Sequence, residues 1–211
     1  FELRILNRDS SSSIDLPDYF LIQLLERKPG LQSVNSFRSS AVVAFQNIAA
    51  AIFSKLDLDD LLQEILEQIS HVIHYDSASI SLLEKDKFKI VAQKGFKNSK
   101  EVIGLEFPQM QSNEWISPNL KAIRSRKSIL LSNVPFEYPF FVSPPDITIK
   151  SWMAIPLLTK TGGIGTLNLD GYSENLFSEE DRYVGELLSA QVAIAIENAM
   201  CYSQAQKEAC T

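Results

Sequence analysis

Cysteine, basic charge and long apolar runs are all scarce in this sequence of 211 residues. Two cysteines, Cys201 and Cys210, are too few for a disulfide framework, which favours a reducing compartment. A net charge of -6 argues against a nucleic-acid partner. No apolar run reaches the roughly 18 residues of a membrane span, and no signal peptide opens the chain. We therefore expect a cytoplasmic protein with no membrane partner.

What is present is ordinary for a globular chain, with 45% hydrophobic and 22% charged residues. The length suits one well-buried domain with an appendage. Residues 1–35 are predicted to be an N-terminal segment, a remnant of an upstream domain, and residues 36–206 to be the main domain with flanking helices. The first residue is Phe1, so we expect the chain to be a piece of a longer protein.

The stretch from Lys150 to Asp181 is the most informative part of the sequence. Side chains alternate along a first strand, with Met153 and Ile155 on one face and Trp152 on the other. Glycines then permit a tight hairpin turn, and a second alternating strand follows. Ser178, followed by three acidic residues, has the pattern of a helix N-cap.

This stretch resembles the C-terminal half of a GAF domain, whose pattern is roughly S-x-x-x-x-P-L, a hairpin, G-x-L-x-L-D, and F-[ST]-x-x-D before a long helix. The matching residues are Ser151, Pro156, Leu157, Gly165, Leu167, Leu169, Asp170, Phe177, Ser178 and Asp181. The resemblance implies an α+β fold, in which a central antiparallel sheet of about five or six strands carries N- and C-terminal helices on one face. Variable loops and a short helix cover the other face.

The rest of the chain gives the same order of elements. Helices are predicted over 35–56 and after Asp57, followed by a hairpin over 78–92. Residues 96–147 are less regular, with a helix over 118–125 and a short strand over 128–131. A last helix is predicted over 179–206.

Specific chemistries known for GAF domains lack their residues here. Gly171-Tyr172 stand where phosphodiesterase-type cyclic-nucleotide sites carry Asn-Lys. The central region has no cysteine for a covalent bilin, and no cysteine precedes Cys201 to serve as the nucleophile of a free methionine sulfoxide reductase. His71 and His74 could share a helix face, but no third ligand accompanies them. We predict no enzyme activity, no metal and no cofactor.

A small-molecule site is nevertheless expected between the sheet and its cover, because apolar walls with a few polar groups suit such a site. Trp152 has the size and N–H of a pocket wall, and Asn168 interrupts an apolar run with a group that is costly to bury unpaired. With Tyr138 and Phe140 of the Pro-rich loop, these residues are predicted to line a cavity for a small, non-covalent, partly apolar ligand. Core packing explains the same aromatic residues equally well.

Apolar residues on two sides of the first and last helices predict a parallel homodimer built on a four-helix bundle. The interface residues are predicted to be Phe37, Phe45, Ile48, Ile52, Leu188 and Val192.

Two functions remain open at this point. The first is a ligand-sensing regulatory domain of a signal-transduction protein, such as a two-component system, linked to an output domain and relaying its signal through the dimer helices. The second is a dimerising transmitter module whose pocket is empty or vestigial. A cavity with convergent polar groups favours the first, and a space filled by aromatic side chains favours the second.

Overall fold

The computed structural model describes residues 42–44, 46–47, 57–97, 99–109, 116–141 and 148–209. The chain divides into two compact units, residues 1–39 and 40–211, and every described residue belongs to the second. The helix predicted over 35–56 is described only at 42–44 and 46–47, which are helical. The predicted segment 1–35 lies outside the described residues, so its boundary stays a prediction.

A six-stranded sheet organises the described chain, with every neighbouring pair antiparallel and the strand order β3-β2-β1-β6-β5-β4. Its strands are β1 (Ser77–Glu84), β2 (Lys87–Lys94), β3 (Glu106–Pro108), β4 (Ile129–Leu131), β5 (Ser151–Leu158) and β6 (Gly163–Gly171). β1 and β2 form one hairpin and β5 and β6 another, so the two hairpins meet where β1 pairs with β6. This confirms the predicted α+β class and both predicted hairpins.

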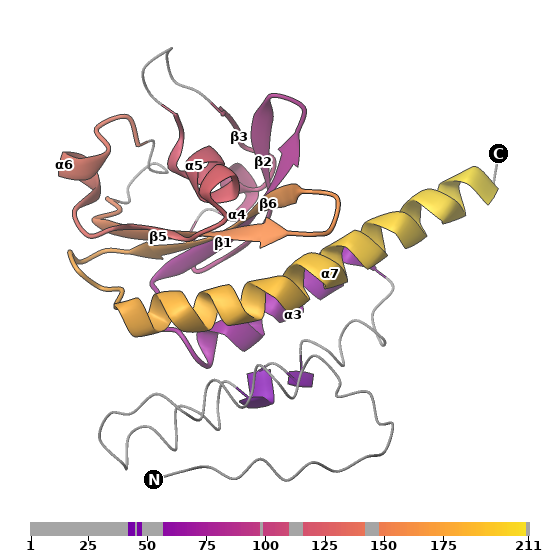
Figure 1. Cartoon of the computed structure of the whole chain (residues 1–211), viewed down its shortest axis with the longest axis horizontal. Coiled ribbons are helices and arrows are strands. Elements are labelled where there is room, and N and C mark those ends of the chain that lie inside the picture. Colours follow the sequence, from indigo (N-terminus) through magenta and orange to yellow (C-terminus); the bar gives the residue numbers. More distant parts are fainter. Residues whose placement is uncertain are drawn as a thin grey trace, which may run out of the picture. The chain divides into compact units, whose positions relative to one another are not determined.

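Two helices cover one face of the sheet, α3 (Leu58–Ser70) and α7 (Glu179–Ala209), as Figure 1 shows. The Asp57 carboxylate caps α3 by accepting from the backbone N–H of Asp59 and Asp60. Ser178 Oγ accepts from the backbone N–H of Asp181 at 3.1 Å, and the Asp181 carboxylate accepts in return from the N–H of Ser178. This reciprocal cap explains why α7 begins where the sequence predicted.

The main core lies between these two helices and the sheet. Alternate strand residues with no more than 7% exposure point toward the helices: Ala78, Ile80, Leu82, Met153, Ile155, Leu157, Leu167 and Leu169. α7 approaches β5 closely at Gly185, where an added Cβ would lie 2.4 Å from Ile155 Cδ1. A larger side chain there would push the helix off the sheet.

The opposite face of the sheet is covered by α5 (Pro118–Ser125), and two single-turn helices complete the structure, α4 (Ser99–Val102) and α6 (Val134–Glu137). α5 has the predicted bounds, whereas α4, β3 and α6 fall in the region read only as irregular. Elements of three or four residues carry too few side chains to establish a periodic pattern.

Pro156 occupies a buried position inside β5. β4 pairs with β5 only as far as Ala154, so Pro156 has a strand partner on the β6 side alone. Proline is tolerated there because the ladder on its other side has already ended.

Candidate functional site

A ladder of buried polar side chains lies on the sheet face that α5 covers. Strand register places residues from β1, β6 and β5 in three rows across this face: Ser77, Asp170 and Trp152; Ser79, Asn168 and Ala154; Ser81, Thr166 and Pro156. Its six polar members, from β1 and β6, are each no more than 5% exposed. We call these six residues the polar ladder. Burying so many polar groups is costly unless each is hydrogen-bonded.

Asn168 is the centre of the ladder. Its Nδ2 donates to Ser81 Oγ at 3.0 Å and to Ser79 Oγ at 3.3 Å on β1. Its Oδ1 accepts from Asn119 Nδ2 of α5 at 2.9 Å, and the same Asn119 amide donates to Thr166 Oγ1 at 2.8 Å. Side chains of two other elements, β1 and α5, therefore converge on this one amide.

Asn119 reaches the sheet because of how α5 begins. Ser117 is the N-cap, with its Oγ accepting from the backbone N–H of Leu120 at 3.2 Å, and Pro118 fixes the first turn. Asn119 is then 4% exposed and points at β6. Hydrogen bonds from Asn119 to the ladder therefore help to fix the position of α5 on the sheet.

Asp170 is the only charged residue of the ladder. Its Oδ2 accepts from Ser77 Oγ at 3.0 Å. Burial raises the pKa of Asp170 to about 7, the Ser77 hydrogen bond acts in the opposite direction, and the nearby charge of Asp76 raises it further. The Asp76 carboxylate accepts from the backbone N–H of Tyr172 at 2.7 Å. Asp170 can therefore change charge near neutral pH.

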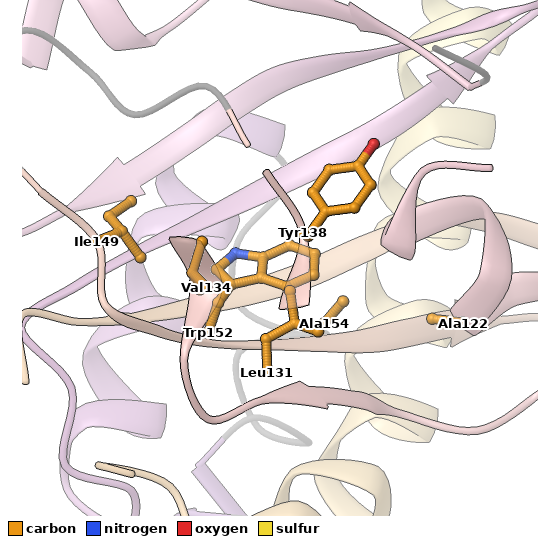
Figure 2. Close-up of a cluster of buried hydrophobic side chains, with 7 residues drawn as sticks. All are labelled: Ala122, Leu131, Val134, Tyr138, Ile149, Trp152 and Ala154. Carbon is orange, nitrogen blue, oxygen red and sulfur yellow. The ribbon is translucent and has the colours of Figure 1, made fainter. Parts of the chain in front are cut away.

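An aromatic and aliphatic cluster adjoins the ladder at the Trp152 row (Figure 2). Its buried members are Ala122, Leu131, Val134, Tyr138, Ile149, Trp152 and Ala154. Phe141 packs edge-on against Trp152 with ring centroids 5.5 Å apart. Burial raises the pKa of the Tyr138 phenol, which therefore stays neutral. This cluster forms an apolar wall beside the polar groups.

Of the four predicted ligand residues, Trp152 and Tyr138 lie together in this cluster. The ring of Phe140 packs edge-on against that of Tyr138, with centroids 6.1 Å apart, but Phe140 is 45% exposed. Asn168 stands apart from them in the ladder, where its row partner on β5 is Ala154. The structure therefore presents two adjacent parts of one face, an apolar cluster and a polar ladder, and these residues stay a prediction as a ligand site.

Six residues of this arrangement were not predicted as site residues: Ser77, Ser79, Ser81, Asn119, Thr166 and Asp170. The available signal was polar residues two apart in both β1 and β6, an alternation that puts each set on one face. Their convergence depends on β1 pairing with β6, strands separated by about eighty residues of chain.

Of the six predicted dimer residues, the structure describes only Leu188 and Val192. Phe37, Phe45, Ile48 and Ile52 lie outside the described residues. Leu188 and Val192 have no exposed surface and belong to the core beneath the sheet. A second chain cannot reach them, so for these two residues the structure does not support the interface. The stripe on the other side of α7 was also apolar in sequence, and there Ile194 is 44% exposed.

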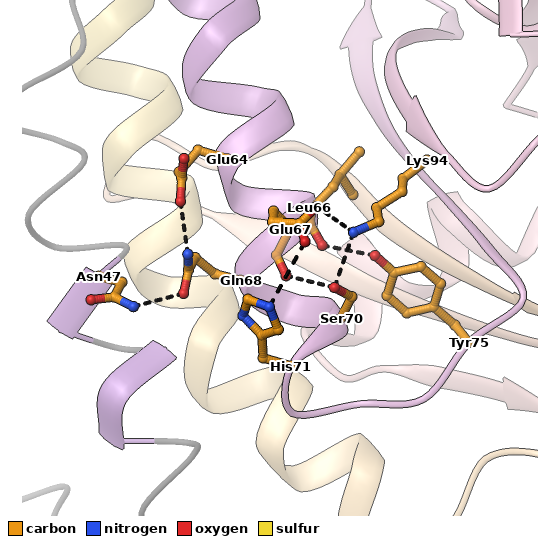
Figure 3. A network of polar contacts seen from close by, with 9 residues as sticks. All are labelled: Asn47, Glu64, Leu66, Glu67, Gln68, Ser70, His71, Tyr75 and Lys94. Atoms are coloured by element: carbon orange, nitrogen blue, oxygen red, sulfur yellow. Dashed lines mark hydrogen bonds and ion pairs between the residues drawn. The ribbon is translucent and has the colours of Figure 1, made fainter.

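A second polar network joins α3 to β2 on the helix side of the sheet (Figure 3). Lys94 of β2 binds Glu67 and donates to Ser70 Oγ at 3.1 Å. The hydrogen bond and charge of Lys94 hold the pKa of Glu67 below its usual value. Gln68 accepts from Asn47 Nδ2 at 2.9 Å. These contacts pair opposite charges and tie elements together, so we interpret them as structural.

His71 is part of the same network, with its Nε2 3.8 Å from Glu67 Oε1. Within the described residues, no group of three His, Cys, Asp or Glu side chains is arranged to hold a metal ion. No helix in the described part of the chain has the length and apolar character of a membrane span.

Comparison with known proteins gives the family of this fold. The GAF domain family matches residues 55–197. The chain is 26% identical over 166 residues to the formate hydrogenlyase transcriptional activator of Salmonella typhimurium, covering 74% of this chain and 23% of that protein. It is 25% identical over 177 residues to the anaerobic nitric oxide reductase transcription regulator NorR of Vibrio vulnificus, covering 81% of this chain and 33% of the regulator. The chain thus spans about a quarter to a third of these relatives.

Solved structures show the same fold. The GAF domain of an Acinetobacter phosphoenolpyruvate-protein phosphotransferase matches with a TM-score of 0.64 and 20% identity, covering 76% of this chain and 94% of that one. A free methionine-R-sulfoxide reductase of Neisseria meningitidis matches with a TM-score of 0.63 and 13% identity, covering 82% and 96%. In the described part of this chain the only cysteine is Cys201, which is exposed on α7. With the family match extending over most of its length, this chain belongs to the GAF domain family.

Proposed function

We propose that this chain is the sensory regulatory domain of a cytoplasmic transcription regulator. In this proposal it binds a small molecule non-covalently on the α5 side of the sheet and has no enzyme activity of its own. The observation that carries the proposal is the polar ladder centred on Asn168, because a face built only for stability would be mostly apolar, as the opposite face is. The two sequence relatives support the linked transcriptional output, since both are transcription regulators.

The path of the chain suggests how such a site could act on an output domain. β6 carries Thr166, Asn168 and Asp170 and ends at Gly171, after which a short loop leads into α7. Asp76 holds the N–H of Tyr172 at the start of that loop. A ligand that changes the ladder therefore acts on the strand that is connected directly to α7. A shift or rotation of α7 is the simplest signal for the next domain.

We further propose that α7 pairs with a second copy of the chain. Its core side carries Leu188 and Val192, and its outward side carries Leu187, Ala190 and Ile194. Leu187, Ile194 and Cys201 are seven residues apart, which is the spacing of a coiled-coil seam. A parallel pairing along this stripe would place the same residues of two copies opposite one another, as two-fold symmetry requires.

The dimer proposal is tested by Ile194→Asp, with Lys121→Asp on exposed α5 as the matched control. Sedimentation at micromolar concentration should show wild type and control as dimers and the Ile194 variant as a monomer. A wild-type monomer, or a variant that dimerises unchanged, contradicts this interface.

A transmitter without a ligand is the second candidate function. Two observations favour it: the Asn168 amide is hydrogen-bonded by the protein's own side chains, and Phe141 packs on Trp152. Native mass spectrometry of the full chain purified from its own host separates the two functions. A bound small molecule whose occupancy falls in Asn168→Ala supports sensing. A bare chain, in preparations that retain weakly bound ligands of a known GAF control protein, supports the transmitter.

A further inference from the structure

No Lys, Arg or His is buried among the described residues, and none belongs to the apolar cluster beside the polar ladder. The basic residues on or next to α5 are all exposed: Lys121, Arg124, Arg126 and Lys127. The described side chains that are buried around the ladder therefore carry no basic charge.

The ladder itself has the same character. Asp170 is its one charged group, only 3% exposed, and its hydrogen-bond donor is the neutral hydroxyl of Ser77. Among the described residues, no Lys, Arg or His forms an ion pair with Asp170. The remaining polar groups are hydroxyls and amides, which can accept hydrogen bonds from a ligand's N–H groups.

This arrangement favours a cationic ligand over an anionic one. An anionic ligand would be buried beside a carboxylate with no basic side chain to neutralise it, which is unfavourable in a site shielded from water. A cation would supply the opposite charge that Asp170 lacks. The edge of the apolar cluster adds to this preference, because a cation is attracted to the faces of Trp and Tyr rings, and Trp152 is the row partner of Asp170 on β5.

We propose that the ligand of this face is a small organic cation bearing N–H groups, held by the Asp170 carboxylate with the hydroxyls and amides of the ladder. This inference rests on the proposed sensing function and adds the ligand's chemical class. In it, Asp170 makes the ion pair and Asn168 and Asn119 orient the ligand. Since Asn119 belongs to α5, occupation of the ladder would alter the hydrogen bonds between α5 and β6.

The pH dependence of binding has a definite sign. Asp170 must lose its proton to bind a cation, and burial raises its pKa to about 7. Asp76 is the charged group beside it, and the phenol of Tyr138 stays neutral because burial raises its pKa. Affinity for a cation should therefore rise about tenfold from pH 6 to pH 8, in line with the ionised fraction of one such carboxyl.

Three probes of one shape test the proposal: acetamidinium, acetamide and acetate, which share the same planar head and differ in charge. Each is titrated into the full chain and followed by the indole N–H signals in ¹H–¹⁵N NMR spectra. Acetamidinium should bind at least about tenfold more tightly than acetate, consistent with one ion pair. In Asp170→Asn this preference should vanish, whereas Asp86→Asn, an exposed turn residue, should behave as wild type.

Each other outcome overturns the inference. Equal or tighter binding of acetate, or an acetamidinium preference that survives Asp170→Asn, excludes Asp170 as the partner of a cation but leaves sensing intact. Failure of all three probes to bind also rejects the cation, and sensing is then judged separately by the mass spectrometry described above.

Discussion

The two faces of the central sheet differ in the polarity of the side chains that they bury. Toward α3 and α7 the strands present mostly apolar side chains, with Ser151 and Lys94 as exceptions. Helix residues such as Leu62, Ile65 and Leu188 are completely buried against this face. Toward α5 the same strands present serines, Thr166, Asn168 and Asp170. Burial of apolar surface is non-directional and stabilises the fold. Buried polar groups add little net stability but require specific geometry. This difference is the basis on which we propose ligand binding at the α5 face.

The largest expected effect lies on the helix face. Leu188→Ala should lower the free energy of unfolding by about 2–5 kcal/mol, because it removes buried methyl groups and leaves a cavity. Ile194→Ala on the exposed side of the same helix should cost less than about 1 kcal/mol in the monomer. Urea unfolding measures the free energy change for both variants, at protein concentrations low enough to keep the chain monomeric. Similar losses for the two variants would mean that α7 is not anchored by its core side.

The next effect lies in the ladder and depends on pH. Folding raises the pKa of Asp170 to about 7, above the unfolded value of about 3.9. The folded state therefore binds the proton more tightly, and this contribution to stability is full below about pH 4 and is lost as pH rises to about 7. It amounts to a few kcal/mol in order of magnitude.

Asp170→Asn should remove this pH dependence, since asparagine resembles the protonated acid. Unfolding free energies of wild type and variant, measured from pH 4 to pH 8, should converge at low pH and diverge as pH rises, with the variant more stable. Asp86→Asn provides the control. Parallel curves for wild type and Asp170→Asn would show that Asp170 titrates normally.

A smaller loss is expected from Asn168→Ala. The substitution leaves Asn119 and the β1 hydroxyls without their shared partner, which costs about 1–3 kcal/mol. Asn198→Ala, exposed on α7, should be neutral within about 0.5 kcal/mol. Thermal unfolding compares the two. If Asn168→Ala does not change the stability, water readily replaces the amide, and the hydrogen bonds of the ladder contribute little to folding.

The smallest effect concerns the connection between the two faces. Ser178→Ala removes the cap of α7 and should cost about 1 kcal/mol. Ser173→Ala, exposed in the loop before it, should cost nothing measurable. Amide hydrogen exchange in the first turn of α7 should accelerate only in the Ser178 variant. Unchanged exchange there would mean that packing, and not the Ser178 cap, stabilises the first turn of α7.

Local patterns predicted most of the fold. Alternation along β5 placed Met153 and Ile155 opposite Trp152, and the Ser178 pattern located the start of α7. The short elements α4, β3 and α6 were missed because three or four residues cannot display a period. Leu188 was assigned to a dimer because a doubly apolar helix does not reveal which of its sides faces its own sheet.

The sequence by itself determined the hairpins, the caps and the GAF order of elements, because these depend on neighbours a few residues apart. It also determined that Asn168 would need partners, since a buried amide is costly alone. Only the tertiary structure decided who those partners are: β1 pairs with β6, and α5 returns Asn119 to the same face. The polar ladder is assembled from segments far apart in the chain, and no local pattern encodes which strands become neighbours.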